Sequence, residues 1–213
     1  MPWNKRPEPS DSAQRAVTAE DEAYLREQAW EAIAPGFRTR DSVMESMVEG
    51  AEYDDESPLT GADARRIVDE LWALRLAQLA IETARPRDDE RVETAFAQLT
   101  AAGIVSTLHL GFDRGEGSDL GRELAERTSG SRGFAYFHAQ DADRLAHPGL
   151  PLYIGFDALD HNEPETYDAA AVAVGEEVRA ALTANGLTVS WDGTVETRIM
   201  VTGLDWRRPL PAS

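Results

Sequence analysis

The segment 132–141 restricts the fold of this chain more than any other, because it is apolar on both faces of an extended strand. Every side chain from Phe134 to Phe137 is aromatic or apolar. Successive side chains of a strand point to opposite faces of the sheet, so this strand needs cover on both faces. We therefore expect an inner strand that ends in three polar residues: His138, Gln140 and Asp141.

The first hundred residues predict four amphipathic helices. They begin near Thr18, Asp41, Thr60 and Asp88, and Gly103 closes the fourth. Asp21, three residues after Thr18, gives a loose capping box. The expected apolar stripes are Tyr24, Leu25, Ala29, Trp30 and Ile33 in the first helix, and Ile67, Val68, Leu71, Trp72, Leu76 and Leu79 in the third.

The second half alternates between strand and helix patterns, in the order β-α-β-α-β-α-β-β. Its expected strands are 104–110, 132–141, 152–156, 187–191 and 195–201, and its expected helices are 118–128, 141–146 and 165–184. The crossovers from the first strand to the second and from the third to the fourth are long enough for parallel pairing. The direction of the third strand relative to the second stays open. Asp192-Gly193 predicts that the last two strands form an antiparallel hairpin.

These patterns predict the α+β class, with a helical N-terminal half packed against a mixed sheet. Residues 1–17 are rich in proline, serine and charge, and we expect them to be a disordered arm. Residues 18–103 form the expected helical region, and 104–208 form the mixed sheet region. The two regions are expected to make one domain.

The formal net charge of −18 at pH 7 decides against several classes of function. Such a surface repels phosphate backbones and anionic lipids, so neither nucleic-acid binding nor membrane binding is expected. Cysteine is absent, which excludes disulfides and thiolate metal sites. The first residues contain no apolar core of a signal peptide and no apolar run approaches 18 residues, so we expect a cytoplasmic protein.

The glycine-rich run from Gly111 to Gly121 follows an expected strand, as a phosphate-binding loop would. Its glycine spacing departs from the dinucleotide fingerprint, and three acidic residues would repel a phosphate. A calcium loop would need glutamate where Leu124 stands. A flexible turn, with Ser118 capping the next helix, is the better interpretation.

His138, Gln140 and Asp141 are the first candidate site, because a histidine and a carboxylate at a strand end can act as base and orienter, or as metal ligands. The structural alternative has Asp141 capping the next helical turn while His138 bonds a nearby backbone group. We favour this alternative, since isolated buried polar groups are usually satisfied structural ones.

A second candidate follows the third strand, where carboxylates and a histidine could hold a divalent metal. The alternative is a charged loop, which is the favoured interpretation in a chain with 39 acidic residues. The candidate ligands are Asp157, His161 and Glu163.

Several longer stretches resemble one family. They are 95–104, 133–141, 152–156, 174–193 and 204–208. Together they resemble an uncharacterised family of high-GC bacterial proteins, domain of unknown function 6891. The resemblance covers 24–208 and implies a fold but no activity.

The sequence leads to a functional hypothesis through charge and through the absence of catalytic signatures. We expect a non-catalytic acidic domain, immunity-like or regulator-like, that binds a basic protein partner and needs no cofactor. The alternative is a small metal-assisted hydrolase that uses His138 and Asp141. A homo-oligomer formed through the helical half stays open.

Overall fold

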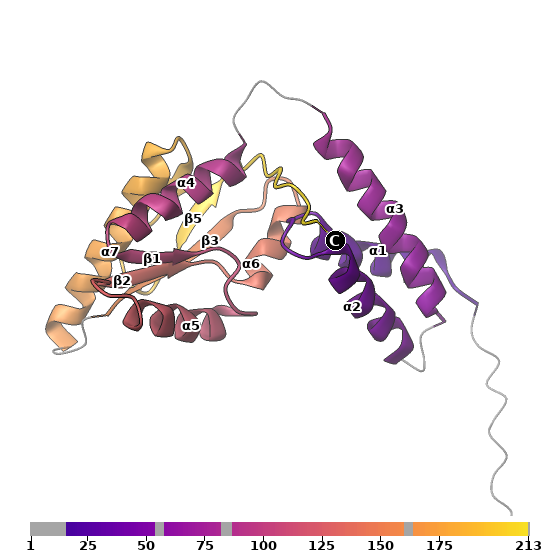
Figure 1. Ribbon diagram of the computed structural model, residues 1–213, viewed down its shortest axis with the longest axis horizontal. Helices are drawn as coiled ribbons and strands as arrows, with labels where there is room; N and C mark the ends of the chain where they lie inside the picture. The colour runs from indigo at the N-terminus through magenta and orange to yellow at the C-terminus, as the bar shows by residue number, and fades with distance from the viewer. Residues whose placement is uncertain (1–15, 54–57, 82–86, 160–163, 213) are drawn as a thin grey trace, which may run out of the picture.

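The computed structural model describes residues 16–53, 58–81, 87–159 and 164–212. In these ranges the chain forms seven α-helices, one short 3-10 helix and a five-stranded mixed sheet, which confirms the predicted α+β class. Figure 1 shows two lobes, one built from α1–α3 and the other from the sheet and its helices. Apart from residues 16 and 17, the predicted disordered arm lies outside the described residues.

The helical lobe consists of α1 (Ala19–Ile33), α2 (Arg40–Tyr53) and α3 (Gly61–Leu79). Capping boxes at the starts of α1 and α3 satisfy backbone N–H groups that would otherwise lack a partner, so both helices begin as predicted. The lobe has its own apolar core, formed mainly by Leu25, Ala29, Ile33, Val43, Ile67, Val68 and Trp72.

The sheet runs in the order β1-β2-β3-β5-β4. Its strands are β1 (Ile104–Thr107), β2 (Gly133–Tyr136), β3 (Leu152–Ala158), β4 (Thr188–Ser190) and β5 (Ile199–Thr202). β1 and β2 are parallel, and every other neighbouring pair is antiparallel. These directions confirm the parallel first pair and the antiparallel last pair, and they settle β3 as antiparallel to β2.

β2 is the inner strand that the sequence predicts, and all four of its residues are buried. Phe134 and Tyr136 face α5 (Arg114–Glu126), whereas Ala135 belongs to the core under α4 (Asp88–Ala101) and α7 (Pro164–Ala184). Figure 1 shows α4 and α7 on one side of the sheet and α5 on the other. β2 is therefore covered on both faces.

Two glycines on the inner face of α5 allow that helix to lie close to β2. A Cβ at Gly117 would lie 2.4 Å from the Tyr136 ring, and a Cβ at Gly121 would lie 2.5 Å from the Phe134 ring. Both distances are far below van der Waals contact, so only glycine fits at this helix–sheet spacing. This packing, rather than a phosphate cradle, accounts for part of the glycine-rich run.

The C-terminal segment joins the two lobes. Trp206 is buried, and its Nε1 donates to the Pro35 carbonyl at 2.9 Å. The carbonyl of Trp206 accepts from Arg75 Nη2 of α3 at 3.1 Å. Arg208 forms an ion pair with Glu93 of α4. The C-terminal segment thus contacts the α1–α2 turn and α3 in the helical lobe, and α4 in the sheet lobe.

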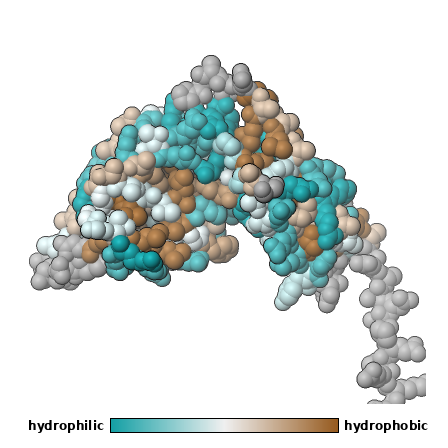
Figure 2. All heavy atoms as spheres, in the orientation of Figure 1, coloured by the Kyte–Doolittle hydropathy of each residue, from teal (hydrophilic) through white to brown (hydrophobic). Residues whose placement is uncertain are grey.

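Several local expectations are corrected by the structure. Tyr24 and Leu76 are exposed rather than buried, because the neighbouring helices cover a narrower stripe of α1 and α3. On α3 the interior position goes to Arg75, which bonds Trp206. Exposed Leu74, Leu76 and Ile81 lie towards the end of α3, where Figure 2 shows apolar residues at the surface.

Element boundaries also differ from those expected, and several strands are shorter; for example, β1 ends at Thr107, β2 ends at Tyr136 and β5 begins at Ile199. α5 begins at Arg114 with Asp113 as its N-cap, not at Ser118, because the Asp113 side chain accepts from the Glu116 backbone N–H. The last two strands do form a hairpin, but a wide loop joins them instead of a two-residue turn. Within that loop the Asp192 carboxylate accepts from the Thr194 N–H and from two threonine hydroxyls.

The close helix–sheet contact predicts that Gly121→Ala destabilises the protein, although alanine normally stabilises a helix relative to glycine by up to about 1 kcal/mol. The added methyl group must displace the buried Phe134 ring, which we expect to cost about 1–3 kcal/mol in urea denaturation. Gly115→Ala on the same helix is the control, since its Cβ would meet its nearest atom at an ordinary 3.4 Å. Equal effects of both substitutions would contradict the packing argument.

Candidate functional site

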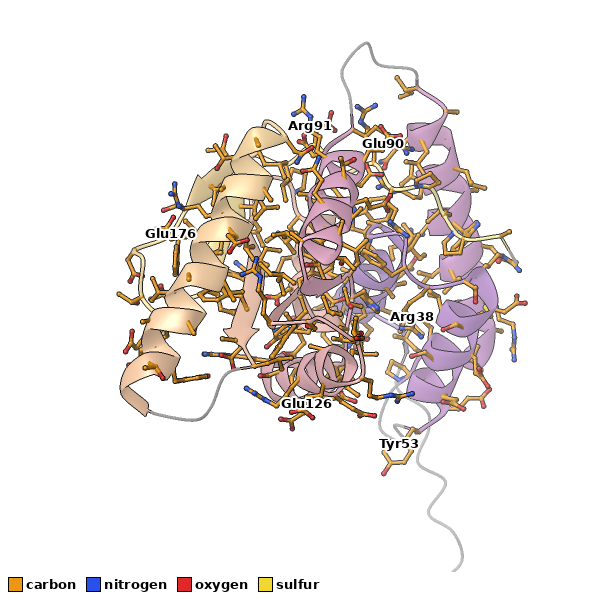
Figure 3. All side chains as sticks on the ribbon, turned by 60° about the vertical axis from the view of Figure 1, so that its left-hand side comes forward. Arg38, Tyr53, Glu90, Arg91, Glu126 and Glu176 are labelled. Carbon is orange, nitrogen blue, oxygen red and sulfur yellow. The ribbon has the colours of Figure 1, made fainter. Side chains whose placement is uncertain are left out.

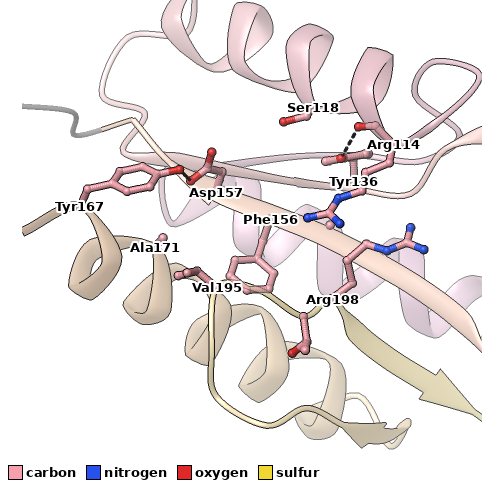
Figure 4. Close-up of a pocket in the computed structure, with 11 residues that line it drawn as sticks. Arg114, Ser118, Tyr136, Phe156, Asp157, Tyr167, Ala171, Val195 and Arg198 are labelled. Atoms are coloured by element: carbon pink, nitrogen blue, oxygen red, sulfur yellow. Dashed lines mark hydrogen bonds between the residues drawn. The ribbon is translucent and has the colours of Figure 1, made fainter. Parts of the chain in front are cut away.

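A cavity of about 140 Å³ lies beside β3, between α5, α7 and the segment that leads into β5 (Figure 4). It forms because Ile154 and Ile199 are the last paired residues of β3 and β5, so the chain before Ile199 diverges from the edge of β3. Its lining is mostly polar and includes Arg114, Ser118, Tyr136, Asp157, Tyr167 and Arg198.

Tyr136 forms the floor of this cavity. Gly155 on β3 makes room for its ring, since a Cβ there would lie 2.7 Å from a Tyr136 ring carbon. The Tyr136 hydroxyl donates to the Arg114 carbonyl at 2.8 Å, which is the dashed line in Figure 4. Burial raises the pKa of Tyr136, so the hydroxyl keeps its proton and this hydrogen bond near neutral pH.

His138 and Asp141, the first candidate pair, lie together at the start of α6 (Ala139–Asp143), which the 3-10 helix η1 (Arg144–Ala146) follows. His138, not Asp141, is the N-cap: its Nδ1 accepts from the Asp141 backbone N–H at 3.3 Å. His138 Nε2 lies 2.9 Å from Asp141 Oδ2 and 3.1 Å from Arg198 Nη1, so it contacts both charged groups. Arg198 Nη1 donates to the same oxygen at 2.7 Å.

This cluster is almost fully enclosed, because His138 is 4% exposed and Asp141 is 2% exposed. Burial is the main cause that lowers the pKa of His138; the Asp141 charge opposes the shift and the Arg198 charge adds to it. Both imidazole nitrogens are occupied by protein groups. The pair reaches the cavity through Arg198, which it holds in place.

Gln140 does not join this cluster. Its side chain is exposed, and its backbone N–H donates to the Phe112 carbonyl at 3.2 Å. The strand ends at Tyr136, so strand alternation no longer applies at these residues, and helical geometry instead brings His138 and Asp141 together. A catalytic role for His138, Gln140 or Asp141 stays a prediction.

Asp157, from the second candidate group, lines the cavity with both carboxylate oxygens engaged. Oδ1 accepts from the Tyr167 hydroxyl at 2.6 Å and from the Ala158 N–H at 2.8 Å, and Oδ2 accepts from Arg122 Nη2 at 2.5 Å. Burial and the Asp157 carboxylate raise the pKa of Tyr167. His161 and Glu163 lie outside the described residues, so the predicted metal site stays a prediction.

The cavity contains two arginines that the sequence analysis did not single out. Arg114 is the first residue of α5 and Arg198 immediately precedes β5, 84 positions later by their numbers. Arg114 lies in the glycine-rich run from Gly111 to Gly121, so this basic residue could have been identified as a candidate from the sequence. No local pattern around Arg198 indicates its role, because the fold alone brings it to Asp141.

A third group joins the two lobes and was also missed by the sequence analysis. Glu27 and Glu31 of α1 and His147 after η1 place one potential metal-ligating atom each within 4.8 Å of one another, the one such group among the described residues. His147 Nε2 lies 2.9 Å from Glu31 Oε1. A hydrogen bond between the imidazole and the Glu31 carboxylate accounts for that distance.

Comparison with known proteins gives a family but no activity. Residues 18–210 match the family described as a domain of unknown function (DUF6891). No curated protein and no solved structure matches the chain. Among the helices of the described ranges, none has the length and apolarity needed to cross a membrane.

Asp143, at the end of α6, gives a pH-dependent prediction. Burial chiefly, together with the Glu31 charge, raises the pKa of Asp143 to about 6. Because this value exceeds that of the unfolded chain, the folded state binds more protons between the two values. The stability that Asp143 contributes is therefore present at low pH and is lost as the pH rises through about 6.

We expect Asp143→Asn to stabilise the protein by about 1–2 kcal/mol at pH 7.5, and by about half as much at pH 5. Urea denaturation at both pH values measures the change. Asp119→Asn on α5 is the control, because this exposed residue reports the general benefit of removing one negative charge from an acidic protein. A gain that is the same at both pH values, or no larger than that of the control, would contradict the assignment.

Proposed function

The chain belongs to the family of domain of unknown function 6891, and we propose that it is a non-catalytic acidic domain that binds a basic protein partner through the outer face of α2. The proposal places the protein in the cytoplasm, in keeping with a sequence that lacks cysteine. An immunity-like or regulator-like role fits such a binding domain.

An acidic stripe on α2 is the observation that carries this proposal. Its four carboxylates, spaced four, four and three residues apart, lie on one side of the helix and are exposed: Asp41, Glu45, Glu49 and Glu52. Among the described residues, none of these four side chains has a hydrogen bond or an ion pair. The carboxylates of Asp41, Glu45 and Glu49 are therefore free to meet an external cation, whereas that of Glu52 packs against Gly61 at the start of α3.

The neighbouring helices differ from α2 in this respect. Several of their acidic side chains form ion pairs with arginines, as Glu22 and Glu70 do with both Arg26 and Arg66. Asp69 of α3 pairs with Arg40. Negative charge within this lobe is thus partly compensated on α1 and α3, whereas no ion pair involves the acidic stripe of α2 among the described residues.

The acidic stripe works against the stability of its own helix. Carboxylates one turn apart repel each other by about 0.2–0.5 kcal/mol per pair. Glu49 and Glu52 also lie near the C-terminal end of α2, where the helix dipole disfavours negative charge, and no basic residue occupies the last turn. A basic partner would replace these repulsions with attraction. Binding such a partner would therefore explain why four carboxylates lie on one side of α2.

Tyr53 extends the same surface. It is the last residue of α2, its side chain is 92% exposed, and Figure 3 shows it pointing away from the molecule. Tyrosine often supplies much of the energy of a protein interface, because it buries a large rigid ring and keeps a polar group. The net charge of −18 would steer a basic partner towards the protein.

The alternative prediction, a metal-assisted hydrolase that uses His138 and Asp141, has less support. A general base needs a free lone pair near its substrate, whereas both nitrogens of the His138 ring are in contact with protein groups, Nδ1 with the Asp141 N–H and Nε2 with Asp141 Oδ2 and Arg198 Nη1. A homo-oligomer remains a separate prediction, which the molecular mass in solution would test.

Charge reversal on the acidic stripe tests the proposal directly. A synthetic helical peptide with lysines every fourth residue serves as the probe, and fluorescence anisotropy measures its binding at 50 mM and 300 mM salt. We expect the double substitution Glu45→Lys, Glu49→Lys to weaken binding by about tenfold or more, since interfacial charge pairs contribute on the order of 1–2 kcal/mol each. Higher salt should weaken binding to the unmodified protein.

The matched control is Asp119→Lys with Glu126→Lys, which makes the same change in net charge on α5 with two exposed acids. Glu126, labelled in Figure 3, is the last residue of α5. If both double variants lose affinity equally, the interaction is a general charge effect and the α2 proposal is wrong. Binding that ignores salt would contradict it as well.

A further inference from the structure

Arg114 and Arg198 reach into one cavity from different elements, and Figure 4 shows both guanidinium groups directed into the space between α5 and the segment before β5. In a chain with 39 acidic and 21 basic residues, two cations that line the same small cavity call for an explanation. We propose that this cavity binds a small dianionic oxyanion of the phosphate type, held between Arg114 and Arg198. The inference is independent of the protein-binding role of α2.

Arg198 is fixed in position before any ligand arrives. Its Nη1 donates to buried Asp141, and its guanidinium lies 4.8 Å from the centre of the Tyr153 ring. Nε and Nη2 have no hydrogen bond to any described residue, so they remain available as donors. A guanidinium held in this way loses little conformational entropy when an anion binds.

Arg114 supplies the second charge. In the described part of the chain, its guanidinium has no ion pair and no hydrogen bond. It lies on the exposed side of the cavity, and the Tyr136 hydroxyl holds only its backbone carbonyl. Two guanidiniums that face one space repel each other, and an oxyanion between them would replace the repulsion with charge-assisted hydrogen bonds.

The carboxylate in the lining does not cancel this attraction. Asp157 is paired with Arg122 and also accepts from Tyr167 and the Ala158 N–H, so its charge is already compensated within the protein. The cavity thus offers an anion the unpaired charge of Arg114, the two free donor nitrogens of Arg198, whose charge is shared with Asp141, and a compensated carboxylate.

The hydroxyl groups narrow the choice of ligand. Tyr136 donates to the Arg114 carbonyl, Tyr167 donates to Asp157 and Thr197 donates to Asp192, so none of these three hydroxyls has a hydrogen left for a ligand. Ser118 is the other hydroxyl in the lining. The main donors are then two planar guanidiniums on different sides. This arrangement favours a ligand with two negative charges and oxygens on several sides, as phosphate has.

The size of the cavity sets an upper limit on the ligand. Its volume of about 140 Å³ equals roughly four or five water molecules at about 30 Å³ each. Pockets for drug-sized molecules hold about 300–1,000 Å³. A phosphate group or the phosphate end of a small monoester fits these limits, whereas a nucleotide would not fit inside.

Isothermal titration calorimetry with inorganic phosphate tests the proposal, at constant ionic strength maintained with chloride. Thermal melting provides a second readout, because a ligand that prefers the native state raises the melting temperature. We expect the unmodified protein to bind phosphate at millimolar concentration or tighter. Methyl phosphate should bind similarly, and malonate tests whether a dicarboxylate can replace the phosphate.

Arg114→Gln is the informative variant, because the exposed side chain can be changed without disturbing the core. It should weaken phosphate binding by about tenfold or more, the usual result of losing a charge-assisted hydrogen bond. Arg127→Gln, at the C-cap of the same helix, is the matched control; it removes an equal charge at an exposed ion pair outside the cavity. It should leave binding within about twofold of the unmodified protein.

Arg198→Lys is a second variant, which keeps a cation beside Asp141 but removes the planar donor group. It should bind phosphate more weakly while retaining the circular dichroism spectrum of the folded protein. No binding of phosphate at 10 mM would overturn the proposal, as would equal losses in Arg114→Gln and Arg127→Gln. Malonate binding without phosphate binding would show that the assigned ligand class is wrong.

Discussion

The double-sided burial of β2 is the constraint on which the rest of the structure depends. Phe134 and Tyr136 require the cover of α5, and Ala135 on the other face requires the cover of α4 and α7. Neither face can be left to water without losing the burial energy of large aromatic side chains. The glycines on α5 follow from the same demand, since they let the helix approach those rings.

The cavity is a consequence of how this sheet ends. β5 pairs with β3 only as far as Ile154, and the chain before Ile199 leaves the strand edge open. The buried cluster of His138 and Asp141 then positions Arg198 at that opening, much as an outer layer of hydrogen bonds orients the ligand-binding groups of a site. The polar residues that follow β2 thus fix the position of Arg198, and their own side chains do not line the cavity.

Charge is distributed unevenly over the molecule, and this matters more than its total. The carboxylates of α1 and α3 are partly compensated by arginines, whereas the acidic stripe of α2 has no ion pair among the described residues. The cavity beside β3 has the opposite character, with two arginines and a paired carboxylate. The acidic stripe is therefore suited to a basic ligand, and the cavity is suited to an anionic one. The net charge of the chain indicates only the acidic surface.

The sequence by itself determined the class of fold, the four N-terminal helices, the inner position of β2 and the directions of the first and last strand pairs. Capping residues such as Thr18 and Thr60, apolar periodicity and strand alternation are local signals, so they can be read from neighbouring residues. The candidates His138, Asp141 and Asp157 were found in the same way. Only the tertiary structure decided that Asp141 meets Arg198, that Arg75 rather than Leu76 faces the interior, and that Arg114 shares a cavity with Arg198. These contacts join residues far apart in the chain, and their partners are set by helix–sheet packing and strand register, which no local pattern specifies.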